Sequence, residues 1–107
     1  MDSLPDLRQL KAFVAVADSG SFTLAARQLH LTQSAVSHSI RTLEDQLGCK
    51  LLERNCRSVK PTAAGEAFLR RTRRVIEDLT EACRELRAHR VEPMCRQTGG
   101  GLQRTAI

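Results

Sequence analysis

The sequence contains no tryptophan, no tyrosine and three phenylalanines, so aromatic residues make up 3% of its 107 positions. Proteins that recognise single-stranded nucleic acids usually stack bases on aromatic side chains. The shortage of aromatic residues therefore argues against that class of binding protein. It also means that the core must consist mainly of leucine, valine, isoleucine and alanine, which suits small, closely packed helices.

Paired cysteines, a leader sequence and a long apolar run are also missing. The four cysteines, at 49, 56, 83 and 95, include no Cys-x-x-Cys pair, so the spacing does not indicate a zinc site at Cys49 and Cys56. A redox-sensing role for the thiol of Cys56 is an alternative that the spacing does not exclude. The N-terminus lacks the features of a signal peptide, and no segment approaches the roughly 20 apolar residues of a membrane span. We therefore predict a cytoplasmic protein with reduced thiols, without a metal, a cofactor or a membrane association.

The short chain and its charge narrow the function further. A chain of 107 residues can build one modest core but has little room for a buried catalytic cleft. No nucleophile–base arrangement or paired carboxylates are evident, and we predict that the protein is not an enzyme. Seventeen lysines and arginines against twelve acids give a net charge of +5. This excess favours a polyanionic partner, because binding releases counterions from a phosphate backbone.

The first helix is predicted from about Asp6 to Gly20. Asp6 and Gln9 have the spacing of a capping box, and Gly20 can adopt the left-handed conformation that ends many helices. The apolar residues that recur at helical spacing, and so form the predicted buried face, are Leu7, Leu10, Phe13, Val14 and Ala17.

Two more helices follow in close succession. The second fits residues 23–29, with Ser21 or Thr23 as its cap. Its inner face is small enough for a close helix crossing and consists of Ala25, Ala26 and Leu29. The third fits residues 33–47, with Thr32 as its cap and a glycine directly after its end. Its predicted buried stripe, spaced by four, three and four residues, is Val36, Ile40, Leu43 and Leu47.

The opposite face of the third helix is polar and has no acid in its first turns. Its residues are Gln33, Ser34, Ser37, His38 and Arg41. Glu44 and Asp45 follow only near the end of the helix. An exposed helix chosen for solubility alone tends to mix glutamate and lysine along its length. This pattern instead indicates a helix that approaches an anion with its N-terminal half.

A small basic β-hairpin is predicted at residues 50–61. Its strands are expected at 50–54 and 59–60, with a turn at 55–58. Pro61 is expected to end the pairing, because proline offers no donor to a strand ladder.

A fourth, long helix is predicted from about Ala63 to His89, with Thr62 as its cap. Residues spaced alternately by four and three are typical of a helix that packs along another helix. These residues, the predicted dimerisation stripe, are Phe68, Thr72, Val75, Leu79, Ala82 and Leu86. The stripe is broad, so part of it can cover its own domain while the rest meets a partner. Beyond Val91, Pro93 and the glycines at 99–101 predict a flexible linker.

Two helices joined by a tight turn, the second with a polar outer face, describe a helix-turn-helix, and a basic hairpin makes it winged. A DNA major groove admits one helix, whose N-terminal side chains reach base edges. We therefore predict a mostly α fold, with a three-helix core and a hairpin wing. We expect this domain to bind duplex DNA. The predicted segments are the winged domain at 1–61, a linker or dimerisation helix at 62–91 and a flexible tail or hinge at 92–107.

Several stretches resemble the N-terminal domain of the LysR-type transcriptional regulators, from residue 7 to about residue 68. They include Leu-Arg-Gln-Leu-Lys-Ala-Phe at 7–13, Gly-Ser-Phe-Thr-Leu-Ala-Ala at 20–26, Leu-Thr-Gln-Ser-Ala-Val-Ser at 31–37, Leu-Leu-Glu-Arg at 51–54 and Pro-Thr-Ala-Ala-Gly at 61–65. The long helix resembles the linker helix of that family. Leu52 and Pro61 replace a frequent Phe and Leu conservatively, whereas His38 replaces a common Arg and leaves open which bases are read there.

The resemblance implies a transcription-regulating homodimer, joined through the linker helix, with two recognition helices in successive major grooves of an interrupted palindrome. It implies that Gln33, Ser37 and His38 face bases or nearby phosphates, and that Arg57 in the wing enters the minor groove. It also implies a larger C-terminal domain that binds a small effector and assembles tetramers, and the 107 residues do not contain it. The closing residues 101–104 are faintly similar to the first strand of such a domain. We therefore expect a fragment, although a cloning-derived or frameshifted tail would look the same.

Several of these residues keep a second interpretation. Thr32 is first of all a cap, although its hydroxyl can also touch phosphate, and the hydroxyl of Ser37 can instead bond back within its own helix. Arg41 and Arg54 either contact phosphates, remain solvated or pair with an acid such as Glu44. The alternative function is a winged-helix protein-interaction module without DNA binding. Its signature would be an acidic or apolar outer face on the third helix, and here that face is polar.

Overall fold

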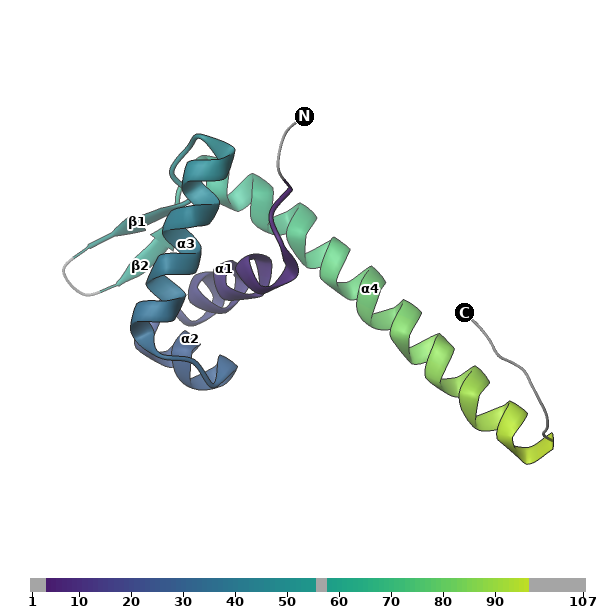
Figure 1. Ribbon diagram of the computed structural model, residues 1–107. Coiled ribbons are helices and arrows are strands. Elements are labelled where there is room, and N and C mark those ends of the chain that lie inside the picture. The colour runs from purple at the N-terminus through teal and green to yellow at the C-terminus, as the bar shows by residue number, and fades with distance from the viewer. Residues whose placement is uncertain (1–3, 56–57, 97–107) are drawn as a thin grey trace. The chain divides into compact units, whose positions relative to one another are not determined.

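The computed structural model describes residues 4–55 and 58–96, with side chains described as far as residue 89. Contacts divide the chain into two compact units, residues 1–74 and 75–107. Within the described ranges the elements are, in chain order (Figure 1), α1 (Leu7–Ser19), α2 (Phe22–Leu29), α3 (Gln33–Leu47), β1 (Leu52–Arg54), β2 (Val59–Pro61) and α4 (Ala63–Arg96). The predicted mostly helical, winged architecture is confirmed.

The first three helices begin where side chains satisfy the free backbone N–H groups of their first turns. At α1 the capping box is present: Asp6 Oδ1 accepts from the Gln9 N–H at 3.0 Å, and Gln9 Oε1 accepts from the Asp6 N–H at 2.8 Å. Ser21 caps α2, which therefore starts at Phe22, one residue earlier than predicted. Thr32 caps α3 by accepting from the Ala35 N–H at 3.0 Å.

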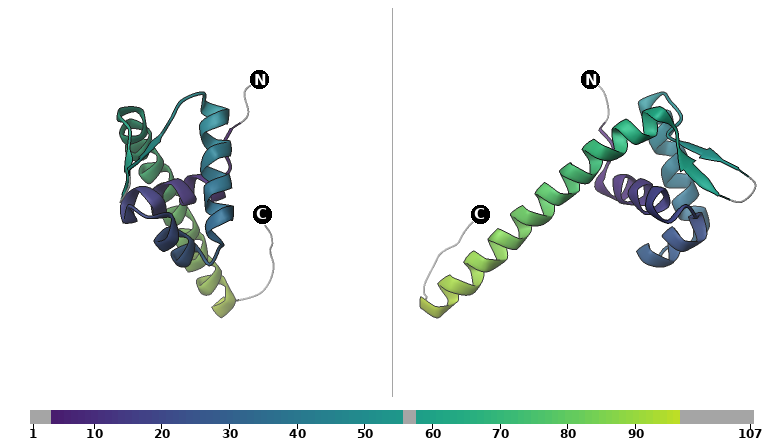
Figure 2. Two further views of the ribbon diagram at one scale, coloured as in Figure 1. Left: turned by 90° about the vertical axis from the view of Figure 1, so that its left-hand side faces the viewer. Right: turned by 180° about the vertical axis from the view of Figure 1, so that it is seen from behind.

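The core of the first unit forms where α1, α2 and α3 meet, and Figure 2 shows the hairpin extending outward beside α3. From α3 the core takes Val36, Ile40 and Leu43, as predicted. Leu47 is 36% exposed instead, because the last turn of α3 continues past the core cluster. From α2 it takes Phe22, Ala25 and Ala26.

The buried face of α1 differs from the prediction. The buried residues are Gln9, Ala12, Phe13 and Val16, whereas Leu7 is exposed and Leu10, Val14 and Ala17 are only partly buried. Two overlapping apolar stripes exist on this helix, and spacing alone cannot rank them. Packing selects the stripe centred on Phe13, whose ring lies 5.7 Å from the ring of Phe68 on α4, centroid to centroid.

The hairpin pairs Leu52 with Pro61, Glu53 with Lys60 and Arg54 with Val59 in antiparallel register. The second strand extends one residue further than predicted, because Pro61 itself pairs with Leu52 and is the last paired residue. The Asn55 N–H donates to the Ser58 carbonyl at 2.8 Å, and hydrogen-bonded pairs alternate along an antiparallel ladder. The Leu52–Pro61 pair is therefore a non-hydrogen-bonded one, in which the missing N–H of proline costs nothing.

The first turns of α4 are fixed to the first unit at three points. Thr62 Oγ1 accepts from the Gly65 N–H at 2.9 Å, as predicted for a cap, and donates to the Lys50 carbonyl at 2.7 Å. Gly65 is buried, and a Cβ there would lie 2.0 Å from the Leu51 carbonyl oxygen. Further along, Arg73 forms a two-pronged ion pair with Asp18 at the end of α1. The helix thus lies directly against the chain that enters β1.

The end of α4 lies at Arg96, beyond the predicted end near His89. The helix continues through Pro93, although proline lacks the N–H that would donate to the carbonyl four residues before it. The glycines at 99–101, predicted to form a flexible linker, lie outside the described residues. Among the residues that are described, no helix combines the length and apolar character needed to cross a bilayer.

We predict that Gly65→Ala lowers the free energy of unfolding by about 1–3 kcal/mol, because the new methyl group forces α4 away from Leu51. Helix propensity alone predicts the opposite sign, a gain of about 1 kcal/mol. Urea denaturation at a fixed protein concentration measures the change. Ala64→Gly, at the exposed neighbouring position, measures the effect of helix propensity alone. A Gly65→Ala variant that is more stable than wild type would contradict the close packing of Gly65 against Leu51.

Candidate nucleic-acid interface

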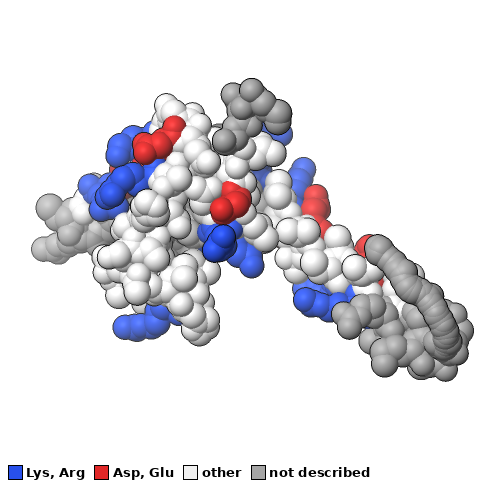
Figure 3. Space-filling model, in the orientation of Figure 1, with Lys and Arg blue, Asp and Glu red and all other residues white. Residues whose placement is uncertain are grey.

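The polar face of α3 lies on the surface. Gln33, Ser34, His38 and Arg41 are exposed, and Ser37 is half-buried. These five residues together line a shallow hollow of about 330 Å³. The structure therefore brings five of the eight predicted DNA-binding residues onto one surface. Figure 3 shows no acidic side chain over the N-terminal half of α3 on the face in view.

Thr32 and Thr23 border this face from its N-terminal end. Thr32 is exposed, and its hydroxyl serves as the cap of α3. Thr23, in the first turn of α2, donates from Oγ1 to Gln33 Oε1 at 3.3 Å. The sequence did not single out Thr23 as a site residue, because the contact arises only once α2 and α3 are folded together. It leaves the amide nitrogen of Gln33 available as a donor.

A second, larger groove of about 700 Å³ separates α3 from the hairpin. Basic side chains from three segments line it: Arg41 on α3, Lys50 in the connecting loop and Arg54 at the end of β1. Figure 3 shows lysine and arginine side chains gathered on the side of α3 that borders the hairpin. Arg41 and Arg54, predicted separately from the sequence, thus belong to one continuous groove.

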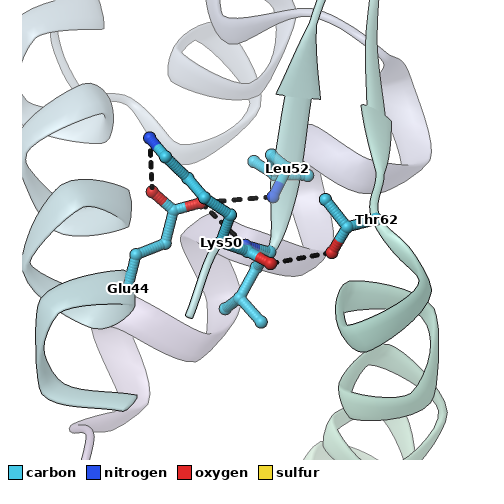
Figure 4. Close-up of polar contacts among 5 residues, drawn as sticks. Glu44, Lys50, Leu52 and Thr62 are labelled. Carbon is cyan, nitrogen blue, oxygen red and sulfur yellow. Dashed lines mark hydrogen bonds and ion pairs between the residues drawn. The ribbon is translucent and has the colours of Figure 1, made fainter. Parts of the chain in front are cut away.

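Glu44 and Glu53 also line this groove, and Glu44 has a structural role (Figure 4). Its Oε2 accepts from the Leu51 N–H at 2.8 Å and the Leu52 N–H at 3.2 Å, and its Oε1 lies 3.8 Å from Lys50 Nζ. Thr62 Oγ1 donates to the Lys50 carbonyl at 2.7 Å, and the Thr62 N–H donates to the Leu51 carbonyl at 2.9 Å. We call these five residues the Glu44 junction. It joins the end of α3, the start of β1 and the start of α4.

The remaining predicted residues fall into three groups. Arg57, expected in the minor groove, and Cys56 lie outside the described residues. Phe68 packs against Phe13, and Thr72 is 3% exposed, so these two cover the core of their own unit. The other residues of the dimerisation stripe are exposed in the second unit: Val75, Leu79, Ala82 and Leu86.

A helical core in which α2, a tight turn and α3 form a helix-turn-helix, with a strand hairpin beside it, defines a winged helix-turn-helix protein. The chain belongs to the bacterial regulatory helix-turn-helix proteins of the lysR family, whose family model matches residues 7–66.

Two curated relatives are transcription regulators. The chain is 46% identical over 85 residues to the glycine cleavage system transcriptional activator of Escherichia coli strain K12, covering 79% of this chain and 28% of that protein. It is 46% identical over 72 residues to the HTH-type transcriptional regulator TcbR of Pseudomonas sp. strain P51, covering 67% and 24%. The chain thus spans about a quarter of the length of these relatives.

Two solved structures of the same fold contain DNA. The CbnR DBD–DNA complex is similar with a TM-score of 0.72 and 42% identity, covering 78% of this chain and 97% of that one. The complex of the BenM DBD with benA site 1 DNA has a TM-score of 0.74 and 36% identity, covering 78% and 93%.

We predict that Glu44→Ala destabilises the first unit by about 1–3 kcal/mol, because it leaves the N–H groups of the buried residues Leu51 and Leu52 without an acceptor. Thermal or urea unfolding measures the loss, and amide hydrogen exchange at residues 51 and 52 should accelerate. Asp45→Ala, an exposed acid one position along, is the matched control with an expected change within about 0.5 kcal/mol. Equal effects of the two substitutions would rule out the junction as a specific contact.

Proposed function

We propose that this chain is the DNA-binding part of a LysR-type transcriptional regulator and that it binds double-stranded DNA sequence-specifically as a homodimer. The observation that carries the proposal is the outer face of α3, which is exposed, polar and free of acids over its first turns. A helix with such a face fits a major groove, where its side chains reach base edges. The similarity to two protein domains that were solved with DNA supports the same function.

In this proposal each residue of the interface has a distinct task. Gln33, Ser37 and His38 contact base edges or adjacent phosphates. The outermost residues and the basic side chains of the groove contact the DNA backbone, and these are Thr32, Ser34, Arg41 and Arg54. Arg57 enters the minor groove. Backbone contacts fix the position of the protein, and base contacts supply the sequence preference.

The dimer is proposed to form through the linker helix, at residues 62–91. The exposed stripe residues Val75, Leu79, Ala82 and Leu86 are apolar or small, and each would be covered by an equivalent helix. Two copies of the winged domain, residues 1–61, would then bind two half-sites of an interrupted palindrome. The segment 92–107 is assigned as a tail or hinge.

The competing function, a protein-interaction module that no longer binds DNA, would show acids or apolar residues on the outer face of α3. The outer face of α3 is polar and has no acid in its first turns, which supports DNA binding instead. We propose no catalytic step for the chain, since its curated relatives regulate transcription. We also propose a cytoplasmic location, where bacterial chromosomal DNA is accessible.

Selection of bound sequences from random duplexes, followed by titration with the selected duplex, tests DNA binding. We expect a symmetric consensus and a log Kd that changes with log salt at a slope of magnitude about 7, if a dimer neutralises about eight phosphates. Gln33→Ala should cost about 1–3 kcal/mol on the selected duplex. Gln46→Ala, the same change in the last turn of α3, is the control. A salt-independent affinity, or equal losses for the two variants, would contradict the proposal.

Leu79→Asp should raise the dissociation constant of the dimer at least about tenfold, because a carboxylate would have to be buried in an apolar helix contact. Sedimentation equilibrium measures the shift. Thr80→Asp places the same charge one position away from the stripe and should leave the dimer intact. If both variants dimerise like wild type, the stripe is not the interface.

A further inference from the structure

Arg54 at the end of β1 lies over the ring of Phe22 at the start of α2, with its Cζ 4.3 Å from the ring centroid. Phe22 is 7% exposed and belongs to the core, whereas Arg54 is exposed. A guanidinium over an aromatic face is attracted by the negative potential of that face. The contact therefore joins a buried core side chain to an exposed cation.

The residue opposite Arg54 on the second strand of the hairpin is also bonded to the connection between α1 and α2. Val59 is the cross-strand partner of Arg54, and its N–H donates to the Gly20 carbonyl at 3.3 Å. Gly20 lies in the connection between α1 and α2, and Phe22 is the first residue of α2. Both residues of the cross-strand pair Arg54 and Val59 thus contact the segment where α1 ends and α2 begins.

The contact with the ring leaves the N–H groups of Arg54 available. Within residues 4–55 and 58–89, the salt bridges join Glu44 to Lys50, Asp18 to Arg73 and Glu81 to Arg84, and none involves Arg54. A guanidinium has five N–H donors in a planar fork that matches a phosphate. Arg54 is therefore held by one side and remains able to donate to a ligand from its edges.

We propose that Phe22 is a positioning residue that holds the Arg54 guanidinium in the groove between α3 and the wing, ready to bind a backbone phosphate of the duplex. A long side chain loses rotamer freedom when it binds, and restraint before binding reduces that loss. The groove is the one that Arg41 and Lys50 also line. The inference rests on the proposed DNA binding and adds Phe22, a core residue, to the residues that support the DNA contact.

Phe22→Leu tests the role, because leucine keeps an apolar side chain in the core but removes the ring face. Affinity for the selected duplex should fall about two- to fivefold, the size of an exposed cation–π contact. In an Arg54→Ala background the same substitution should have no further effect. Phe13→Leu, a second core phenylalanine whose ring contacts Phe68 instead, should reduce stability without any coupling to Arg54.

NMR of the free protein gives a readout that does not depend on DNA. The side-chain Cδ and Nε protons of Arg54 should be shifted upfield by the Phe22 ring, and Phe22→Leu should return them to ordinary arginine positions. Unshifted Arg54 protons in the wild-type chain would overturn the inference, even if Phe22→Leu fails to fold. So would equal losses of affinity for Phe22→Leu in the wild-type and Arg54→Ala backgrounds. A wild-type chain that shows the shift but binds no duplex would contradict the proposed function itself, and with it the role of the contact.

Discussion

The arrangement of the interface depends on the carboxylate of Glu44, which accepts from two consecutive backbone N–H groups just after α3 ends. Leu51 and Leu52 are 1% and 7% exposed, so water has little access to these donors and the carboxylate is their acceptor. One side chain thereby fixes how the chain turns from α3 into the wing. It also explains why an acid is tolerated beside a basic groove, since its oxygens are engaged by the backbone and by Lys50.

The three phenylalanines make contacts that join other elements of the fold. Phe13 and Phe68 join α1 to the first turns of α4, and Phe22 joins α2 to β1 through Arg54. Alanines at 25 and 26 fill the centre of the helical core, where small side chains permit close crossings. A chain poor in aromatic residues has thus placed each one between elements that are distant in sequence.

Local sequence was enough to predict much of the fold. The caps at Asp6 and Thr32 and the limits of α3 depend on bonds between residues three apart, so spacing reveals them. The face of α1 was misassigned because two stripes overlap and only packing around Phe13 decides between them. The polar face of α3 was predictable from its lack of acids. The contacts of Thr23 with Gln33 and of Phe22 with Arg54 were not, because each depends on tertiary placement that no local pattern encodes.

The continuity of α4 has a consequence for how such chains can vary. Thr62, through its bond to the Lys50 carbonyl, and Gly65 and Arg73 fix the first turns of the helix to the winged domain, and the exposed stripe begins at Val75. Each residue of a helix turns the next by about 100°. Insertion or loss of one residue within the stripe, between Val75 and Leu86, would therefore move the stripe residues that follow to another face of α4, whereas a seven-residue change would nearly restore their face. The stripe of α4 should accordingly tolerate a change in length only where the change keeps its residues on one face of the helix, whichever apolar side chains occupy it.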